Sequence, residues 1–116
     1  MKGGYSMSAT VEFKEETKGN WNILKAIGRI DTTTASLAEQ AGLAAIDKSS
    51  QLAFDMSQLN YISSAGLRVL LRIGKKAKKE KKIFVLCGIS GMVKEILEDS
   101  GTDMLFQVYE SADDLN

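Results

Sequence analysis

The sequence contains no histidine, and this absence excludes several kinds of active site before any motif is considered. Histidine is the general base of Ser-His-Asp triads and the commonest metal ligand, so such triads and histidine-bound zinc are both excluded. The only cysteine, Cys87, leaves no internal disulfide and favours a reducing, cytoplasmic location. No apolar run approaches the roughly 20 residues of a membrane-spanning helix, and no signal peptide is recognisable. We therefore expect a binding module rather than an enzyme, without metal, cofactor or membrane insertion.

The chain also lacks an excess of charge of either sign, because its fifteen Lys and Arg residues balance fifteen Asp and Glu residues. Direct nucleic-acid binding requires a concentrated basic face, and a neutral chain argues against it. One basic run stands out, since residues 75–82 include six lysines. We interpret this run as the solvent-exposed end of a helix, where the helix dipole favours cations, with a nucleic-acid surface as the alternative. A length of 116 residues is typical of one domain.

Patterning in the first part of the chain predicts a β-hairpin. Residues 1–9 are small and polar, and we expect a loose segment there, or alternatively a short ordered strand. Apolar and polar residues alternate over Thr10–Glu15, which predicts a strand with one solvent-exposed face. A second strand is expected over Trp21–Ile30, after a turn at residues 18–20. So short a connection predicts antiparallel pairing of the two strands.

A helix, a buried strand and a second helix are expected next. The oxygen-bearing side chains of Asp31–Thr34 suit a helix N-cap, and the helix should run to Lys48. Its apolar positions at helical spacing are Leu37, Ala38, Ala41, Ala44 and Ala45. The apolar run Gln51–Met56 predicts a strand covered on both faces, followed by a loop over Ser57–Tyr61. The second helix should begin near Ser64.

The rest of the chain continues the alternation of helices and strands. The apolar positions of the second helix are Leu67, Leu70, Leu71 and Gly74. A parallel strand is expected over Ile83–Cys87, and a helix that ends at Gly101 should follow it. The buried positions of this helix are predicted to be Met92, Val93, Ile96 and Leu97. Met104–Tyr109 is expected to be a last strand, and Ser111–Asp114 the capped start of a helix. The element order ββαβαβαβ predicts an α/β fold with a mostly parallel sheet and right-handed crossovers.

Two consecutive serines, Ser63 and Ser64, begin the second helix at the edge of the sheet where open α/β folds bind their ligands. One interpretation is helix capping alone, because serine is a preferred N-cap residue. A second is nucleophilic catalysis, which is disfavoured because no histidine is present to activate a hydroxyl. A third is phosphorylation, since the free amides and the dipole of a helix N-terminus tolerate the added negative charge.

The sequence around these serines resembles that of the STAS-domain anti-sigma factor antagonists, the bacterial anti-anti-sigma family. The most specific matching segments are Asp55–Ser57 and Tyr61–Leu67. Weaker matches are Gly28–Asp31 and Gly88–Ser90, the latter followed by Val93 and Leu97. The resemblance extends from Thr10 to Tyr109. It implies a single STAS domain over residues 10–116, with a mixed, mostly parallel sheet of four to five strands, an N-terminal hairpin and three to four helices.

The resemblance also implies a function. In this family the serine directly before a small residue, Gly and Leu is phosphorylated by an anti-sigma serine kinase, and here that position is Ser64. Many relatives carry Asp where this chain has Ser63, so it stays open which serine is modified, with Ser64 favoured. The unphosphorylated protein would bind the kinase and release a sigma factor. Phosphorylation would end that binding, and a phosphatase would restore it.

A candidate partner surface follows from this placement, on a protein expected to be a monomer or weak dimer. Asp31 is expected either beside the partner site or as a simple helix cap. Asp55 and Ser57 should hold their loop by local hydrogen bonds. Leu67 is interpreted as a core residue or a contact, and Arg68 as a solvated side chain or a contact. The candidate partner-binding residues are Asp31, Asp55, Ser57, Ile62, Ser63, Ser64, Gly66, Leu67, Arg68 and Ser90.

Other functions remain as alternatives at this point. Within the same fold, the alternatives are an accessory STAS subunit of a membrane lipid-transport complex and a stressosome-type scaffold. A nucleotide-binding protein of flavodoxin-like shape is a further alternative, but no Gly-rich phosphate loop follows a strand in the required form.

Overall fold

The computed structural model describes residues 11–116, so the prediction made for residues 1–9 lies outside the described part of the chain. The elements are β1 (Val11–Lys18), β2 (Trp21–Ile30), α2 (Ala35–Asp47), β3 (Gln51–Ile62), α3 (Ser64–Lys79), β4 (Ile83–Cys87), α4 (Gly91–Ser100), the 3-10 turn η1 (Thr102–Leu105), β5 (Val108–Tyr109) and the 3-10 turn η2 (Ala112–Asp114). Their order is the one predicted from the patterning. The left-handed Gly101, with φ 75°, ends α4 as expected.

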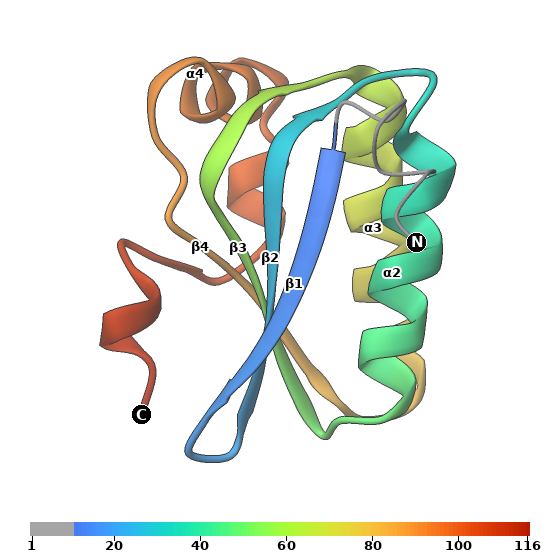
Figure 1. Ribbon diagram of the computed structural model, residues 1–116, viewed down its shortest axis with the longest axis vertical. Coiled ribbons are helices and arrows are strands. Elements are labelled where there is room, and N and C mark those ends of the chain that lie inside the picture. Colours follow the sequence, from blue (N-terminus) through green and yellow to red (C-terminus); the bar gives the residue numbers. More distant parts are fainter. Residues whose placement is uncertain (1–10) are drawn as a thin grey trace.

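The five strands form one sheet in the order β1-β2-β3-β4-β5 (Figure 1). β1 and β2 pair antiparallel, with Val11 opposite Gly28 and Lys18 opposite Trp21, which confirms the predicted hairpin. All other neighbours pair in parallel. The predicted α/β fold with a mixed, mostly parallel sheet is therefore confirmed.

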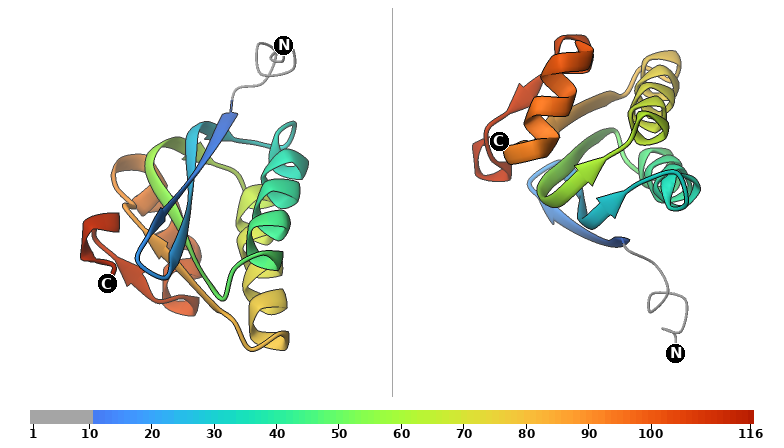
Figure 2. Two further views of the ribbon diagram at one scale, coloured as in Figure 1. Left: turned by 60° about the horizontal axis from the view of Figure 1, so that its bottom comes forward. Right: turned by 90° about the horizontal axis from the view of Figure 1, so that it is seen from above.

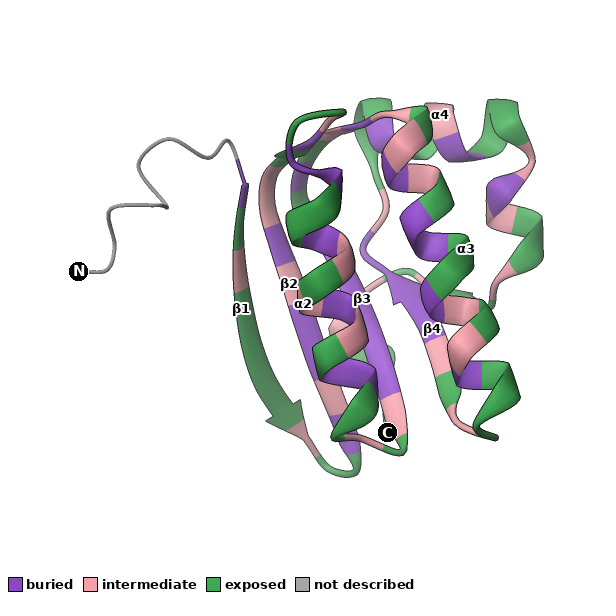
Figure 3. Ribbon diagram, turned by 90° about the vertical axis from the view of Figure 1, so that its right-hand side faces the viewer, coloured by how far each residue is buried: buried purple, intermediate pink, exposed green. Residues whose placement is uncertain are grey.

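Hydrophobic packing holds α2 and α3 side by side against one face of the sheet (Figure 2). Gly42 of α2 has no side chain, and this lets Ile73 of α3 lie against it. Buried and exposed segments alternate along both helices, as expected of amphipathic helices (Figure 3). α4 lies near the end of the sheet where β3 terminates (Figure 1), and it adds Val93 and Leu97 to the same core.

A smaller apolar cluster covers part of the opposite face of the sheet. Its members are Trp21, Ile23, Ala53, Val85, Cys87 and Leu115. The ammonium of Lys18 donates to the carbonyls of Ala112 and Asp113, at 3.2 and 2.8 Å, which ties η2 to the hairpin. Between residues 11 and 116, no helix has both the length and the apolar character needed to cross a membrane.

Two predicted boundaries were wrong. Residues Ser57–Tyr61, predicted as a loop, belong to β3, which stays paired with β2 as far as Ile62. β4 ends at Cys87, opposite Asp55, so the second half of β3 has a neighbour on one side only and carries exposed polar residues. In the predicted last strand, Met104–Tyr109, only Val108 and Tyr109 form β5 beside β4, and the first two residues, Met104 and Leu105, belong to η1.

Some apolar side chains predicted to be buried are exposed. They are Leu37, Ala44, Leu71 and Met92. In α2 the buried stripe is instead formed by Ala35, Ala38, Gly42, Ala45 and Ile46. Spacing alone predicted too wide a buried stripe, because each helix touches the sheet along a narrow line and leaves the flanking apolar residues in water.

Candidate functional site

The carboxyl ends of β2 and β3 meet at one edge of the sheet. Ile30 and Ile62 are paired as the last residues of the two strands. The backbone amide of Ser63 donates to the carbonyl of Ile30 at 2.8 Å, which continues the ladder by one bond. Asp31 and Ser63 each leave the sheet directly after this pair, so the two loops that begin α2 and α3 lie next to each other.

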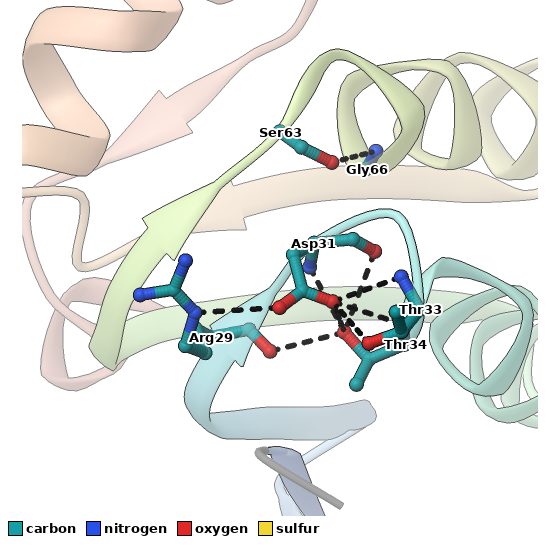
Figure 4. A network of polar contacts seen from close by, with 6 residues as sticks. All are labelled: Arg29, Asp31, Thr33, Thr34, Ser63 and Gly66. Carbon is teal, nitrogen blue, oxygen red and sulfur yellow. Dashed lines mark hydrogen bonds and ion pairs between the residues drawn. The ribbon is translucent and has the colours of Figure 1, made fainter.

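Ser63 is the N-cap of α3. Its backbone is extended, with φ −89° and ψ 173°, and its hydroxyl accepts a hydrogen bond from the amide of Gly66 at 3.3 Å (Figure 4). Its carbonyl accepts the first helical bond, from the amide of Leu67 at 2.9 Å. The hydroxyl of the half-buried Ser63 therefore caps the N-terminus of α3.

Ser64 is the first residue of α3 and its side chain is exposed. Within residues 11–116 its hydroxyl has no hydrogen-bond partner, in contrast to that of Ser63. The helix dipole at this end favours negative charge. Of the two serines, Ser64 thus presents an accessible hydroxyl at a place where an added phosphate is electrostatically tolerated.

Gly66 and Ile62 lie beneath this surface. A Cβ on Gly66 would approach Cγ1 of Ile62 to 2.6 Å and Cγ2 of Ile30 to 2.8 Å, and both isoleucines are 1% exposed. The missing side chain lets the first turn of α3 pack directly on the ends of β2 and β3. Leu67 is half-buried and packs against the same core. These residues set the position of Ser64, and of the three only Leu67 reaches the surface in part.

Asp31 is the centre of a hydrogen-bond network (Figure 4). Its Oδ1 accepts from the hydroxyl of Thr33 at 2.7 Å, the amide of Thr33 at 2.9 Å and the amide of Thr34 at 3.1 Å. Its Oδ2 lies 3.4 Å from Nε of Arg29. These bonds, led by that from the Thr33 hydroxyl, lower the pKa of Asp31 to about 2. Asp31 thus fixes the turn before α2 and places a permanent negative charge at the edge that carries Ser64.

A pair that the sequence did not reveal, Arg29 and Tyr61, flanks Asp31. The two residues are opposite each other in β2 and β3, and the Arg29 guanidinium lies 4.7 Å from the centre of the Tyr61 ring. This distance is that of a cation–π contact. Arginine and tyrosine are common among the residues that dominate binding at interfaces. The pairing depends on the irregular register of β2 and β3, for which the sequence carries no signal.

Asp55 and Ser57 lie elsewhere, in the middle of β3 beside the end of β4. Asp55 is 4% exposed, and its Oδ1 accepts from the amide of Ser57 at 2.9 Å. Gly88, with φ 73°, lies against both, since a Cβ there would be 2.8 Å from that same oxygen. The predicted site residues therefore fall into two groups along β3, and Asp55 and Ser57 are local hydrogen-bond partners in the second.

The last two candidates, Arg68 and Ser90, are both exposed. Arg68 lies one helical turn after Ser64 on α3, so both are on one face of the helix. Ser90 is the residue before α4 and makes no side-chain cap bond there. It follows Gly88, the residue that lies against Asp55 and Ser57, by two positions in the chain.

The chemistry available at these positions suits docking. Among residues 11–116, no group of three His, Cys, Asp or Glu side chains is placed to hold a metal ion. Cys87 is buried in β4, and burial raises the pKa of its thiol to about 12, so it is a poor nucleophile at neutral pH. This edge of the sheet offers the accessible hydroxyl of Ser64, the charged carboxylate of Asp31, and the exposed Arg29 in contact with the half-buried Tyr61.

Comparison with known proteins identifies the family of this chain. The STAS domain family matches residues 12–115. The chain is 35% identical over 85 residues to "Putative anti-sigma factor antagonist BtrV" of Bordetella bronchiseptica, covering 72% of this chain and 73% of that protein. An anti-sigma factor antagonist from Mycobacterium paratuberculosis has a similar structure, with a TM-score of 0.81 and 27% identity over 90% of this chain and 89% of the other. The phosphorylated form of Bacillus SpoIIAA shares the fold, with a TM-score of 0.66 and 13% identity over 88% and 94% of the two chains. A family match over nearly all described residues, together with the BtrV identity, places the chain among the STAS-domain anti-sigma factor antagonists, a family of non-enzymatic regulators.

Proposed function

We propose that this protein, in its unphosphorylated form, binds an anti-sigma serine kinase in the cytoplasm and so releases a sigma factor. In the same proposal, the kinase transfers the γ-phosphoryl group of ATP to Oγ of Ser64. The hydroxyl loses its proton, ADP leaves, and the kinase no longer binds. A phosphatase that hydrolyses the phosphoserine returns the protein to the binding form.

The observation that carries this proposal is that the hydroxyls of the two serines have different surroundings. The Ser63 hydroxyl is engaged with the amide of Gly66, whereas the Ser64 hydroxyl is exposed and has no partner within residues 11–116. Phosphorylation of Ser63 would remove the hydroxyl that caps α3 from its bond with the amide of Gly66. Phosphorylation of Ser64 leaves this cap in place. That SpoIIAA, a protein of this fold, has a phosphorylated form is consistent with a modification of this kind.

The electrostatic consequence is large enough for a switch. A phosphoserine adds a charge of about −1.5 to −2 at neutral pH. Asp31, ionised at all physiological pH values, already places one negative charge at this edge. A partner surface that fits a hydroxyl and a single carboxylate must then face two anionic groups. Each 1.4 kcal/mol of penalty is about a tenfold loss of affinity, so a few kcal/mol weaken binding roughly 100-fold to 1000-fold.

Phosphorylation is tested with the purified protein, ATP and each anti-sigma serine kinase encoded by the host. We expect one added phosphate, located at Ser64 by tandem mass spectrometry. Ser64→Ala should abolish the modification, and Ser63→Ala should retain it. If Ser64→Ala is still modified at Ser63, the assignment of the serine is wrong.

Binding is tested by calorimetry with the same kinase. Ser64→Glu should weaken binding about 100-fold or more. Ser50→Glu makes the same chemical change at an exposed serine directly before β3, at the opposite end of that strand, and should leave binding within about threefold. If none of the host kinases binds the unmodified protein, partner switching is refuted and a scaffold or transport role gains support.

A further inference from the structure

A groove lies on the outer surface of the protein, along the C-terminal half of α3. It is bounded on one side by α3 between Leu71 and Lys78 and on the other by the segment from Leu105 to Gln107, and its volume is about 440 Å³. A second hollow of about 380 Å³ continues it along α3 and shares Leu71 and Lys75 with it. The groove begins seven residues after Ser64, roughly 10 Å along the helix, and the second hollow reaches back along α3 to Arg68.

The floor of this groove is apolar. Phe84 and Phe106 pack edge to face with their ring centres 5.8 Å apart. Gly74 has no side chain, and this lets the Phe106 ring pack against α3, since a Cβ on Gly74 would lie 2.8 Å from Cε1 of Phe106. Leu71 and Leu105, on opposite sides of the groove, are 38% and 66% exposed. Apolar side chains gathered in a hollow and left in water are typical of a docking surface.

The rim of the groove is basic. Lys75, Lys78 and Lys82 line it, and no acidic residue does. The ammonium of Lys82 is already engaged, because it donates to the carbonyls of Ile46 and Asp47. Lys75 and Lys78 form no ion pair with any residue between 11 and 116. Two uncompensated cations therefore stand beside an exposed apolar floor.

We propose that this groove docks an acidic amphipathic helix of a partner protein. The apolar floor requires large apolar side chains on one face of that helix, and the free lysines require carboxylates on its flanks. The span from Leu71 to Lys78 is about 10 Å along α3, which matches two turns of a docked helix. The concave shape favours an inserted helix over a lipid bilayer, because a flat surface cannot reach the floor formed by Phe84 and Phe106.

The probe for this proposal is a fluorescein-labelled synthetic peptide of about four helical turns. It carries leucines at i, i+3, i+4 and i+7 and glutamates on their flanks. Fluorescence polarisation should detect saturable binding. A scrambled peptide of the same composition, which has the same charge but no apolar stripe, should bind at least about tenfold more weakly.

Charge reversal at the rim supplies the matched test. Lys75→Glu with Lys78→Glu should weaken binding of the patterned peptide about tenfold or more. Lys14→Glu with Lys79→Glu makes the same change in net charge at exposed lysines that do not line the groove, and should weaken it less than about threefold. Equal binding of the two peptides, or equal losses in the two double variants, would overturn the proposal. So would binding to phosphatidylglycerol vesicles in preference to the patterned peptide.

Discussion

Replacing Ser63 by alanine is expected to lower the stability of the protein, whereas the same change at Ser64 is not. Loss of a serine N-cap costs about 0.5–2 kcal/mol in general. Here the hydroxyl satisfies one amide, that of Gly66, at 3.3 Å, which is long for such a bond. We therefore expect a loss of about 0.5–1 kcal/mol for Ser63→Ala, or a fall in Tm of about 2–4 °C.

The expected value for Ser64→Ala is within about 0.5 kcal/mol of the wild type, because its exposed side chain makes no bond to the rest of residues 11–116. Urea denaturation followed by circular dichroism at 222 nm measures both variants. Together with the phosphorylation assay, this measurement separates the roles of the two serines. Ser63→Ala should affect stability, and Ser64→Ala should affect modification. If Ser64→Ala lowers the free energy of unfolding more than Ser63→Ala, the assignment of the cap is refuted.

The remaining predictions concern a tight contact, an ionised carboxylate and a buried thiol. Gly66→Ala presses a methyl group against Ile62, and we expect the free energy of unfolding to fall by about 1–2 kcal/mol despite the better helix propensity of alanine; an unchanged urea midpoint would contradict this. Because the pKa of Asp31 is lowered from 3.8 to about 2, chiefly by the Thr33 hydroxyl, its ionised form stabilises the folded state, and this contribution is lost as the pH falls between those values. Asp31→Asn should show a shallower loss of stability over that range, and parallel curves for variant and wild type would refute it. Cys87 should resist a thiol reagent at mildly alkaline pH until the protein unfolds, since burial raises the pKa of its thiol to about 12; rapid labelling of the folded protein would show this to be wrong.

Local patterns in the sequence predicted most of the fold. The alternation in β1 and β2, the helical spacing in α3 and the apolar run of β4 each depend on residues close together in the chain, so the sequence carries these signals directly. The same patterns failed where the tertiary surroundings decide. Residues Ser57–Tyr61 look like a loop because they are polar, yet β2 offers them a partner and they continue β3.

The candidate site divides in the same way. The sequence by itself determined that two serines begin a helix that follows a buried strand, because capping residues and helical periodicity are local properties. Only the tertiary structure decided which serine is the cap, and that Arg29 meets Tyr61. It also decided that the lysines of α3 border an apolar groove completed by Phe106. These contacts join residues that are distant in the chain. They are fixed by the register of the sheet and by the way α3 packs on it, and no short stretch of sequence encodes either of these.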